Sequence, residues 1–134
     1  MDFRVRNSEN LRTMPCAIAS ATVIEAGDLV TLSSGLIIKA VAGSTAIAYA
    51  PDGSADGETS IDVTIGNDFQ LLGTGDANFA ITQKGTEVDL VGTTNQLIDV
   101  GASTTDVLKI AIDQDAGTVG ATTDIAVKIN KPLF

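Results

Sequence analysis

The sequence contains no histidine, no tryptophan and a single cysteine among its 134 residues. Without histidine, neither a Ser-His-Asp nor a Cys-His nucleophilic system can be assembled from this chain, and metal sites built from cysteine and histidine are excluded as well. One cysteine allows no disulfide within the chain. Cys16 lies in the apolar run CAIASATVI, where we expect it to be a small core residue. The composition therefore indicates no enzyme activity and no cofactor.

Long apolar runs and a leader peptide are also missing from the sequence. No stretch approaches the roughly 18 apolar residues that cross a bilayer, and no charged-then-apolar segment ends in a cleavage site. We therefore expect a soluble protein that is made and used inside a cell and has no membrane partner. A chain of this length with 44% hydrophobic residues can bury a core without a disulfide or metal. A single compact domain is the resulting expectation.

Positive charge is scarce and unevenly placed. The chain has eight Lys and Arg against 17 Asp and Glu, a formal net charge of −9, which argues against nucleic acid as a partner. All three arginines lie in the first twelve residues, and the remaining cations are five lysines spread over an acidic body. The planar guanidinium group suits carboxylate pairing at interfaces. The N-terminal segment is therefore either a solvated tail or a contact arm that docks on an acidic partner.

Turn-forming residues punctuate the chain about every eight to twelve residues, a spacing typical of an all-β sandwich or barrel. Aromatic residues make up only 4% of the chain, and its apolar content comes mainly from Val, Ile, Leu and Ala, which favours strands. No long helical pattern fits between the turns. The sequence predicts strands at 17–25, 29–32, 36–41, 46–50, 59–65, 69–72, 78–82, 87–91, 96–100, 107–112 and 125–129.

Strict alternation of apolar and polar residues marks two of these strands, 59–65 and 125–129, and predicts one buried and one wet face for each. The stretch EAGDLVTLSSGLIIKA, residues 25–40, is interpreted as a hairpin with turns at Gly27-Asp28 and Ser34-Gly35. Its expected core residues are Leu29, Leu32, Leu36 and Ile38.

Three loops contain residues that could carry chemistry. Asp52, Ser54 and Asp56 occupy the first positions of a calcium-loop pattern, but Val63 stands where the bidentate Glu belongs, so a turn-rich hairpin loop is the ordinary explanation and we expect no metal site. Gly73-Thr74-Gly75 is too short for a dinucleotide motif and is interpreted as a turn. The third loop holds three acids that could act in acid and base catalysis only in a cleft, and we expect it to be exposed: Asp113, Asp115 and Asp124.

The only clear compositional shift is at the N-terminus, where FRVRNSENLRTMPC is charged, irregular and closed by Pro15. Such a segment has no obvious partner strand within a β body. We therefore expect an extended N-terminal arm at 1–15 and a β body at 16–134.

Four stretches follow one another along the body: AGDLVTLSSGLIIKA, AIAYAPDGSADGETSIDVTI, KGTEVDLVGTTNQLIDVGASTTDVLKIAID and DIAVKIN. In this order they resemble the small β-rich capsid decoration, or cement, proteins of tailed bacteriophages. In that family a Gly-Asp-Leu-Val hairpin precedes an Ile-Ala strand and an acidic, glycine-rich loop, and a late Val- and Ile-rich strand closes the barrel. The resemblance covers most of residues 17–130 and implies a compact β-barrel or β-tulip-like fold.

The resemblance also implies a function and partners. Such a protein is made in the host cytoplasm and binds the outer capsid surface of the virion, commonly as a homotrimer, where it holds neighbouring major capsid protein subunits together. Members of the family often dock through an N-terminal extended segment that adds a strand to the capsid surface. The positions of this chain that match the capsid-binding arm are Asp2, Phe3, Arg4, Val5, Arg6, Asn7, Leu11, Arg12 and Met14.

Two other classes share parts of this pattern. A fibre or tail component, or an adhesin-like β domain, has the same acidic, Thr-rich β composition, but such proteins more often show repeats, secretion signals or aromatic-lined glycan sites. A biotinyl or lipoyl carrier domain has turns like those around Gly27-Asp28, yet no lysine stands at a hairpin apex in the setting that modification requires. The decoration protein is the leading hypothesis, with the other virion module as the alternative.

Overall fold

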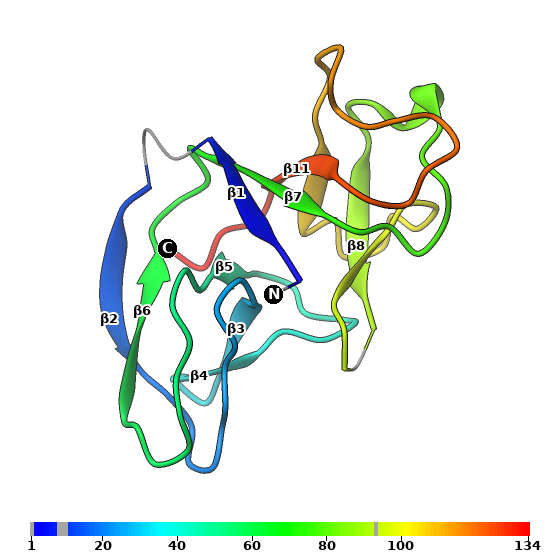
Figure 1. Ribbon diagram of the computed structural model, residues 1–134. Coiled ribbons are helices and arrows are strands. Elements are labelled where there is room, and N and C mark those ends of the chain that lie inside the picture. The colour runs from blue at the N-terminus through cyan, green and yellow to red at the C-terminus, as the bar shows by residue number, and fades with distance from the viewer. Residues whose placement is uncertain (1, 8–10, 93) are drawn as a thin grey trace.

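The computed structural model describes residues 2–7, 11–92 and 94–134 (Figure 1). These residues form strands and loops with one short 3-10 turn, and every strand pair is antiparallel. The predicted all-β class is confirmed. The elements are β1 (Arg4–Asn7), β2 (Thr13–Ala17), β3 (Leu29–Ser33), β4 (Leu36–Lys39), β5 (Ala48–Tyr49), β6 (Ser60–Thr64), β7 (Gln70–Gly73), η1 (Ile81–Gln83), β8 (Glu87–Val91), β9 (Leu97–Asp99), β10 (Leu108–Ile110) and β11 (Ile125–Ile129).

The largest sheet has the strand order β1-β7-β11-β10-β8-β9. The strand at the far edge, β9, lies beside the segment that follows β7, where Gly75 and Ile98 form a parallel bridge. The Ile98 N–H donates to the Thr74 carbonyl at 2.8 Å, and the Asp76 N–H donates to the Ile98 carbonyl at 2.9 Å. The sheet therefore curls so that β9 lies beside the segment that follows β7, and β1 extends the sheet on the other side of β7.

The larger of two hydrophobic cores lies against the inward face of this sheet. Leu71, Leu108, Ile110, Ile125 and Ile129 are at most 1% exposed. The predicted face of 125–129 is confirmed, and Ala126 of that strand is buried as well.

The other half of the molecule contains the pair β2-β6 and the sheet β4-β3-β5 around a second core. A parallel bridge between Ile18 and Ile37 joins the end of β2 to β4. Alternate residues of the three-stranded sheet serve the two cores: Leu29 faces the larger one, whereas Val30 faces the second. This sheet is therefore the layer that holds the two halves together.

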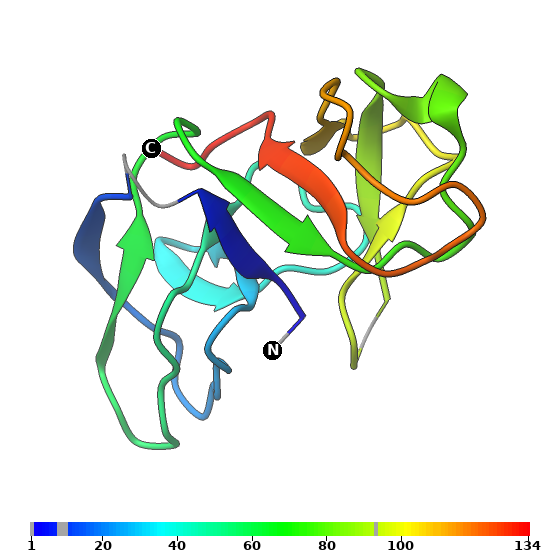
Figure 2. The ribbon, with the colours of Figure 1, turned by 45° about the horizontal axis from the view of Figure 1, so that its top comes forward.

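The N-terminal segment differs from the expected arm. β1 pairs with β7, and β2 pairs with β6, so its described residues belong to the body (Figures 1 and 2). Phe3 is 1% exposed and Val5 packs against the larger core, while Arg4 and Arg6 alternate with them. The division into an arm at 1–15 and a body at 16–134 is corrected accordingly. The alternation of Phe3 and Val5 with Arg4 and Arg6 is that of a half-buried strand, but it spans too few residues to identify the distant strand that pairs with it.

Several expected strands and core positions also differ. Only Ala17 of 17–25 lies in a strand, and 78–82 contains a loop and η1. In the hairpin, Leu29 is buried as predicted, but Ile37 is buried in place of Leu32 and Leu36, which are 41% and 38% exposed. The hairpin tip lies outside both cores, so these two leucines are only partly covered.

Candidate interaction surface

The outward face of the sheet β1-β7-β11-β10 gathers most of the features that could bind a partner. Leu108, Ile110, Val127 and Ile129 are buried, so the residues between them, Lys109 and Lys128, lie on the opposite face. Arg4 and Arg6 extend this face along β1, and Figure 2 shows β1, β7 and β11 side by side. We call this surface the sheet outer face. Four of the eight cations of the chain lie on it.

Arg6 is held by a bidentate contact to a carboxylate that is distant in sequence. Its two terminal nitrogens lie 2.9 and 2.5 Å from the two carboxylate oxygens of Asp113, and one of them also donates to the Gln70 side chain at 2.7 Å. These hydrogen bonds from Arg6 lower the pKa of the Asp113 carboxyl to about 2. The loop that contains Asp113, which we expected to be exposed, is therefore bound to β1 through this contact.

Arg4 makes a second link of the same kind, with a nitrogen 2.8 Å from a carboxylate oxygen of Asp124. Between the two arginines and the loop lies a hollow of about 450 Å³, and its lining residues are Arg4, Arg6, Leu72, Asp115, Gly117, Thr118 and Asp124. Three acids that were candidates from sequence thus reappear here as partners or neighbours of arginines. Their surroundings suit a binding surface more than acid and base chemistry.

The Arg6–Asp113 contact predicts a pH dependence. Because the pKa of Asp113 is lower in the folded state, its contribution to stability is present above pH 3.8 and is lost as the pH falls through about 2. Half of the Asp113 side chain is exposed, so we expect Asp113→Asn to lower the free energy of unfolding by only about 0.2–1 kcal/mol at neutral pH. The difference from the wild type should shrink as the pH approaches about 2 in urea titrations and vanish below it. An equal difference at both pH values would contradict the assignment.

A second hollow on the sheet outer face, of about 220 Å³, lies beside Gln70 and contains both lysines; its lining residues are Gln70, Lys109, Ile110, Ala111, Ile112 and Lys128. Lys109 and Lys128 are direct cross-strand neighbours. Neither makes an ion pair with any residue that the structure describes. Sequence analysis missed this pair, although both lysines stand out as the polar members of otherwise buried strands.

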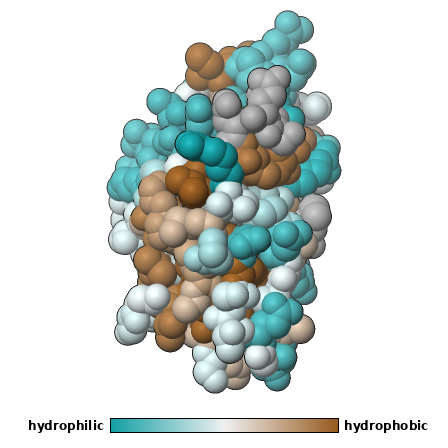
Figure 3. Space-filling view, turned by 90° about the vertical axis from the view of Figure 1, so that its left-hand side faces the viewer, coloured by the Kyte–Doolittle hydropathy of each residue, from teal (hydrophilic) through white to brown (hydrophobic). Residues whose placement is uncertain are grey.

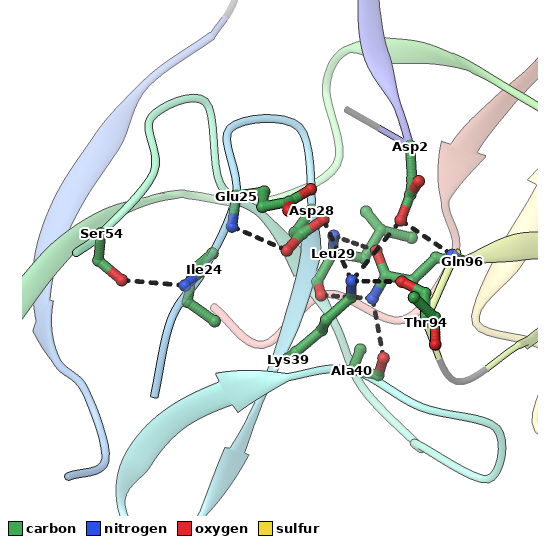
Figure 4. Close-up of polar contacts among 10 residues, drawn as sticks. All are labelled: Asp2, Ile24, Glu25, Asp28, Leu29, Lys39, Ala40, Ser54, Thr94 and Gln96. Atoms are coloured by element: carbon green, nitrogen blue, oxygen red, sulfur yellow. Dashed lines mark hydrogen bonds and ion pairs between the residues drawn. The ribbon is translucent and has the colours of Figure 1, made fainter. Parts of the chain in front are cut away.

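Asp2 belongs to a different polar cluster, between the two halves of the molecule (Figure 4). One of its oxygens accepts the Gln96 N–H at 2.9 Å and lies 3.7 Å from Lys39 Nζ. Lys39 Nζ also donates to the Thr94 carbonyl and lies 3.6 Å from Oδ1 of Asp28. Burial raises the pKa of the Asp28 carboxyl, against the opposing effect of the Glu25 N–H and the Lys39 ammonium.

Gln96 is the organising side chain of this cluster and is only 1% exposed. Its oxygen accepts the Leu29 N–H, and its amide nitrogen donates to the carbonyls of Leu29 and Ala40, each at 2.8 Å. The β8–β9 loop is thereby joined to the hairpin of the other half (Figure 4). No local signal in the sequence distinguishes this glutamine from any other loop residue.

The remaining residues of the expected capsid-binding arm are divided between core and surface. Phe3, Val5 and Leu11 pack in or against the larger core, and Met14 packs against the second core. Asn7 pairs through its backbone with Gln70, and Arg12 is exposed. The structure therefore brings Arg4 and Arg6 together on one face and assigns the apolar members of the set to packing.

An apolar area lies elsewhere, on the side that carries β2 and β6, where Figure 3 shows apolar residues gathered between hydrophilic margins. Exposed large side chains in this half include Val23, Leu32 and Leu36. Cys16 is half-buried on β2 against the second core, and burial raises the pKa of its thiol. This area is a second surface suited to contact with another protein.

The serine of the candidate calcium loop, Ser54, already accepts a hydrogen bond from the backbone. Ser54 is 5% exposed and its hydroxyl accepts the Ile24 N–H at 3.1 Å, whereas Asp52 and Asp56 are exposed. Within the described ranges, no three or more Cys, Asp or Glu residues converge in a way that could hold a metal ion. Likewise, none of the described segments forms a helix long and apolar enough to cross a membrane.

Comparison with family models, with curated proteins and with solved structures found no significant match to this chain.

Proposed function

We propose that this protein is a capsid decoration protein of a tailed bacteriophage. It binds the outer surface of the assembled head and stabilises contacts between major capsid protein subunits. The observation that carries the proposal is the concentration of Arg4, Arg6, Lys109 and Lys128 on one sheet face of a chain with a net charge of −9. Arg4 and Arg6 are paired with Asp124 and Asp113, so the positive charge left without an ion pair on this face, among the described residues, is that of Lys109 and Lys128. This charge gives an acidic molecule a preferred orientation at an acidic surface.

The sheet outer face is the side that we assign to the shell, and it replaces the free arm as the docking element. β1 is already paired with β7, so it contributes outward side chains to the contact. The acidic remainder faces solvent, where repulsion between decorated heads discourages clumping. A homotrimer that engages several subunits at once needs only modest affinity at each site. The apolar side with β2 and β6 is available for contacts between copies.

The direct test uses expanded heads that lack a decoration protein. We expect the protein to co-sediment with them in a fixed ratio to the major capsid protein and the binding to weaken as salt rises, because exposed charges are screened. Heads incubated with bovine serum albumin, another acidic protein, provide the control. Absence of stoichiometric binding would refute the proposal.

The alternative is a structural or binding module elsewhere in the virion, such as a fibre or tail component. It rests on the same acidic β architecture and the same cationic face. Gold-labelled protein added to complete particles separates the two in electron micrographs. Label on heads supports decoration, and label confined to tails supports the alternative.

A further inference from the structure

We propose that the hollow between Lys109 and Lys128 is a docking site for an acidic, partly apolar segment of the partner protein. This inference rests on the proposed function and names the chemistry of the shell surface that the protein recognises. The occupant is a peptide segment that carries carboxylates next to apolar side chains. A second copy of this chain and a free anion are outcomes that the test distinguishes.

The first argument is the position of the two ammonium groups. β10 and β11 pair antiparallel with Lys109 directly opposite Lys128, so the two side chains leave the sheet on the same face. They line a single hollow of about 220 Å³ together with the Gln70 side chain. Two cations thus converge on one site from neighbouring strands of one sheet.

The second argument is that neither lysine is held in an ion pair among the described residues. Like charges directly opposite each other destabilise a strand pair, and among the described residues neither lysine has an ion pair. Glu87 is the cross-strand neighbour of Lys109 on β8, yet no ion pair joins these two side chains either. The nearby acids Asp113 and Asp124 are engaged by Arg6 and Arg4. The isolated chain therefore leaves a repulsive pair that a carboxylate from outside would relieve.

The third argument is the apolar margin of the hollow. Ile112 is 76% exposed at the end of β10, and Ala111 lines the hollow beside it. An inorganic anion would gain nothing from these side chains. An acidic segment with an apolar side chain next to its carboxylate would bury Ile112 while it neutralises the lysines.

The test begins with backbone amide chemical shifts of the isotope-labelled protein. The probe is a synthetic peptide of alternating Asp and Leu with blocked ends, and the matched probe has Asn in place of Asp. We expect shifts confined to residues 109–112 and 128 with the acidic peptide, and an apparent affinity about tenfold weaker in the variant Lys109→Gln/Lys128→Gln. Shifts of the same size with the Asn peptide or with inorganic phosphate would overturn the proposal, as would no localised shift.

A control variant, Arg12→Gln/Lys131→Gln, removes the same amount of positive charge from two residues that do not line the hollow. It should bind the acidic peptide like the wild type. Both variants should unfold cooperatively at or near the wild-type temperature, since all four side chains reach solvent. If both variants lose the same amount of peptide affinity, the loss is explained by net charge alone, and the proposal of a defined site is contradicted.

Binding to undecorated heads then separates this inference from the proposed function. If heads bind the wild type and the control variant but not Lys109→Gln/Lys128→Gln, both stand. If heads bind all three equally, the decoration function stands and the docking site is wrong. If heads bind none of the three proteins, the decoration function is refuted. The peptide titration by itself then shows whether the hollow binds acidic segments. Self-association that the lysine variant abolishes would make the occupant a second copy and overturn the assignment to a partner.

Discussion

Phe3→Ala is expected to lower the free energy of unfolding by about 3–5 kcal/mol, the range for truncating a well-packed core phenylalanine. Phe3 is 1% exposed and belongs to the larger core. Its ring lies so close to the backbone of β7 that a side-chain carbon added at Gly73 would come within 2.7 Å of Phe3 Cδ1. Removal of the ring therefore leaves a cavity that neighbouring backbone cannot fill by a small shift. Chemical denaturation followed by circular dichroism measures the loss.

Arg4→Ala is the matched control, because it changes the next residue of the same segment on the opposite face. The Arg4 side chain is 57% exposed and pairs with an exposed carboxylate, so we expect a loss below about 1 kcal/mol. If the two substitutions lower the free energy of unfolding by similar amounts, Phe3 is not a core residue and the N-terminal segment is a separate arm. If Phe3→Ala behaves as expected, deletion of the N-terminal residues is no test of function, because it removes part of the core.

Gln96→Ala is expected to lower the free energy of unfolding by about 2–6 kcal/mol, since it leaves two buried backbone groups without a partner and each such group costs about 1–3 kcal/mol. The substitution removes three hydrogen bonds and leaves the Leu29 N–H and the Ala40 carbonyl unpaired in a buried place, whereas the Leu29 carbonyl still accepts the Ala40 N–H at 2.9 Å. The lost bonds connect the two halves of the molecule (Figure 4). Thermal unfolding should show a lower midpoint, and amide exchange should accelerate in the β3–β4 hairpin.

Two further variants identify the cause. Gln114→Ala removes an exposed glutamine and should change stability by less than about 0.5 kcal/mol. Gln96→Glu keeps the size of the side chain, but an ionised carboxylate can accept from Leu29 and cannot donate to the two carbonyls. Burial would raise the pKa of the new carboxyl, so stability should increase as the pH falls through that pKa. A pH-independent Gln96→Glu variant with wild-type stability would show that the network is dispensable.

The strands that could be predicted from sequence are those whose signal is local. Regular turn residues and alternating apolar residues located β3, β4, β6, β8 and β11 to within one or two positions. The predictions failed where burial depends on a distant segment. Leu32 and Leu36 are as apolar as Leu29, yet they lie at a hairpin tip outside both cores. Residues 78–82 have strand-like composition but no neighbouring strand to pair with among the described residues.

The candidate surface shows the same division. Arg4 and Arg6 were singled out from sequence because arginine occurs nowhere after residue 12. Their pairing with Asp124 and Asp113 joins residues more than a hundred positions apart, and composition carries no information on such distances. The sequence marks Lys109 and Lys128 as polar residues within apolar strands, but only the register of β10 and β11 places them face to face.

By itself, the amino-acid sequence determined the all-β class, the approximate strands and the acidic character, and the lack of histidine excluded histidine-dependent catalysis. These properties follow from alternating apolar residues, turn-forming residues and residue counts. Each of these can be read from neighbouring residues or from the composition of the whole chain. The tertiary structure alone decided that the N-terminal segment is a strand of the body and that the cations share one sheet face. The reason is that strand pairing and burial depend on which distant segments meet, and antiparallel pairing brings together residues whose separation along the chain is unrelated to their distance in space.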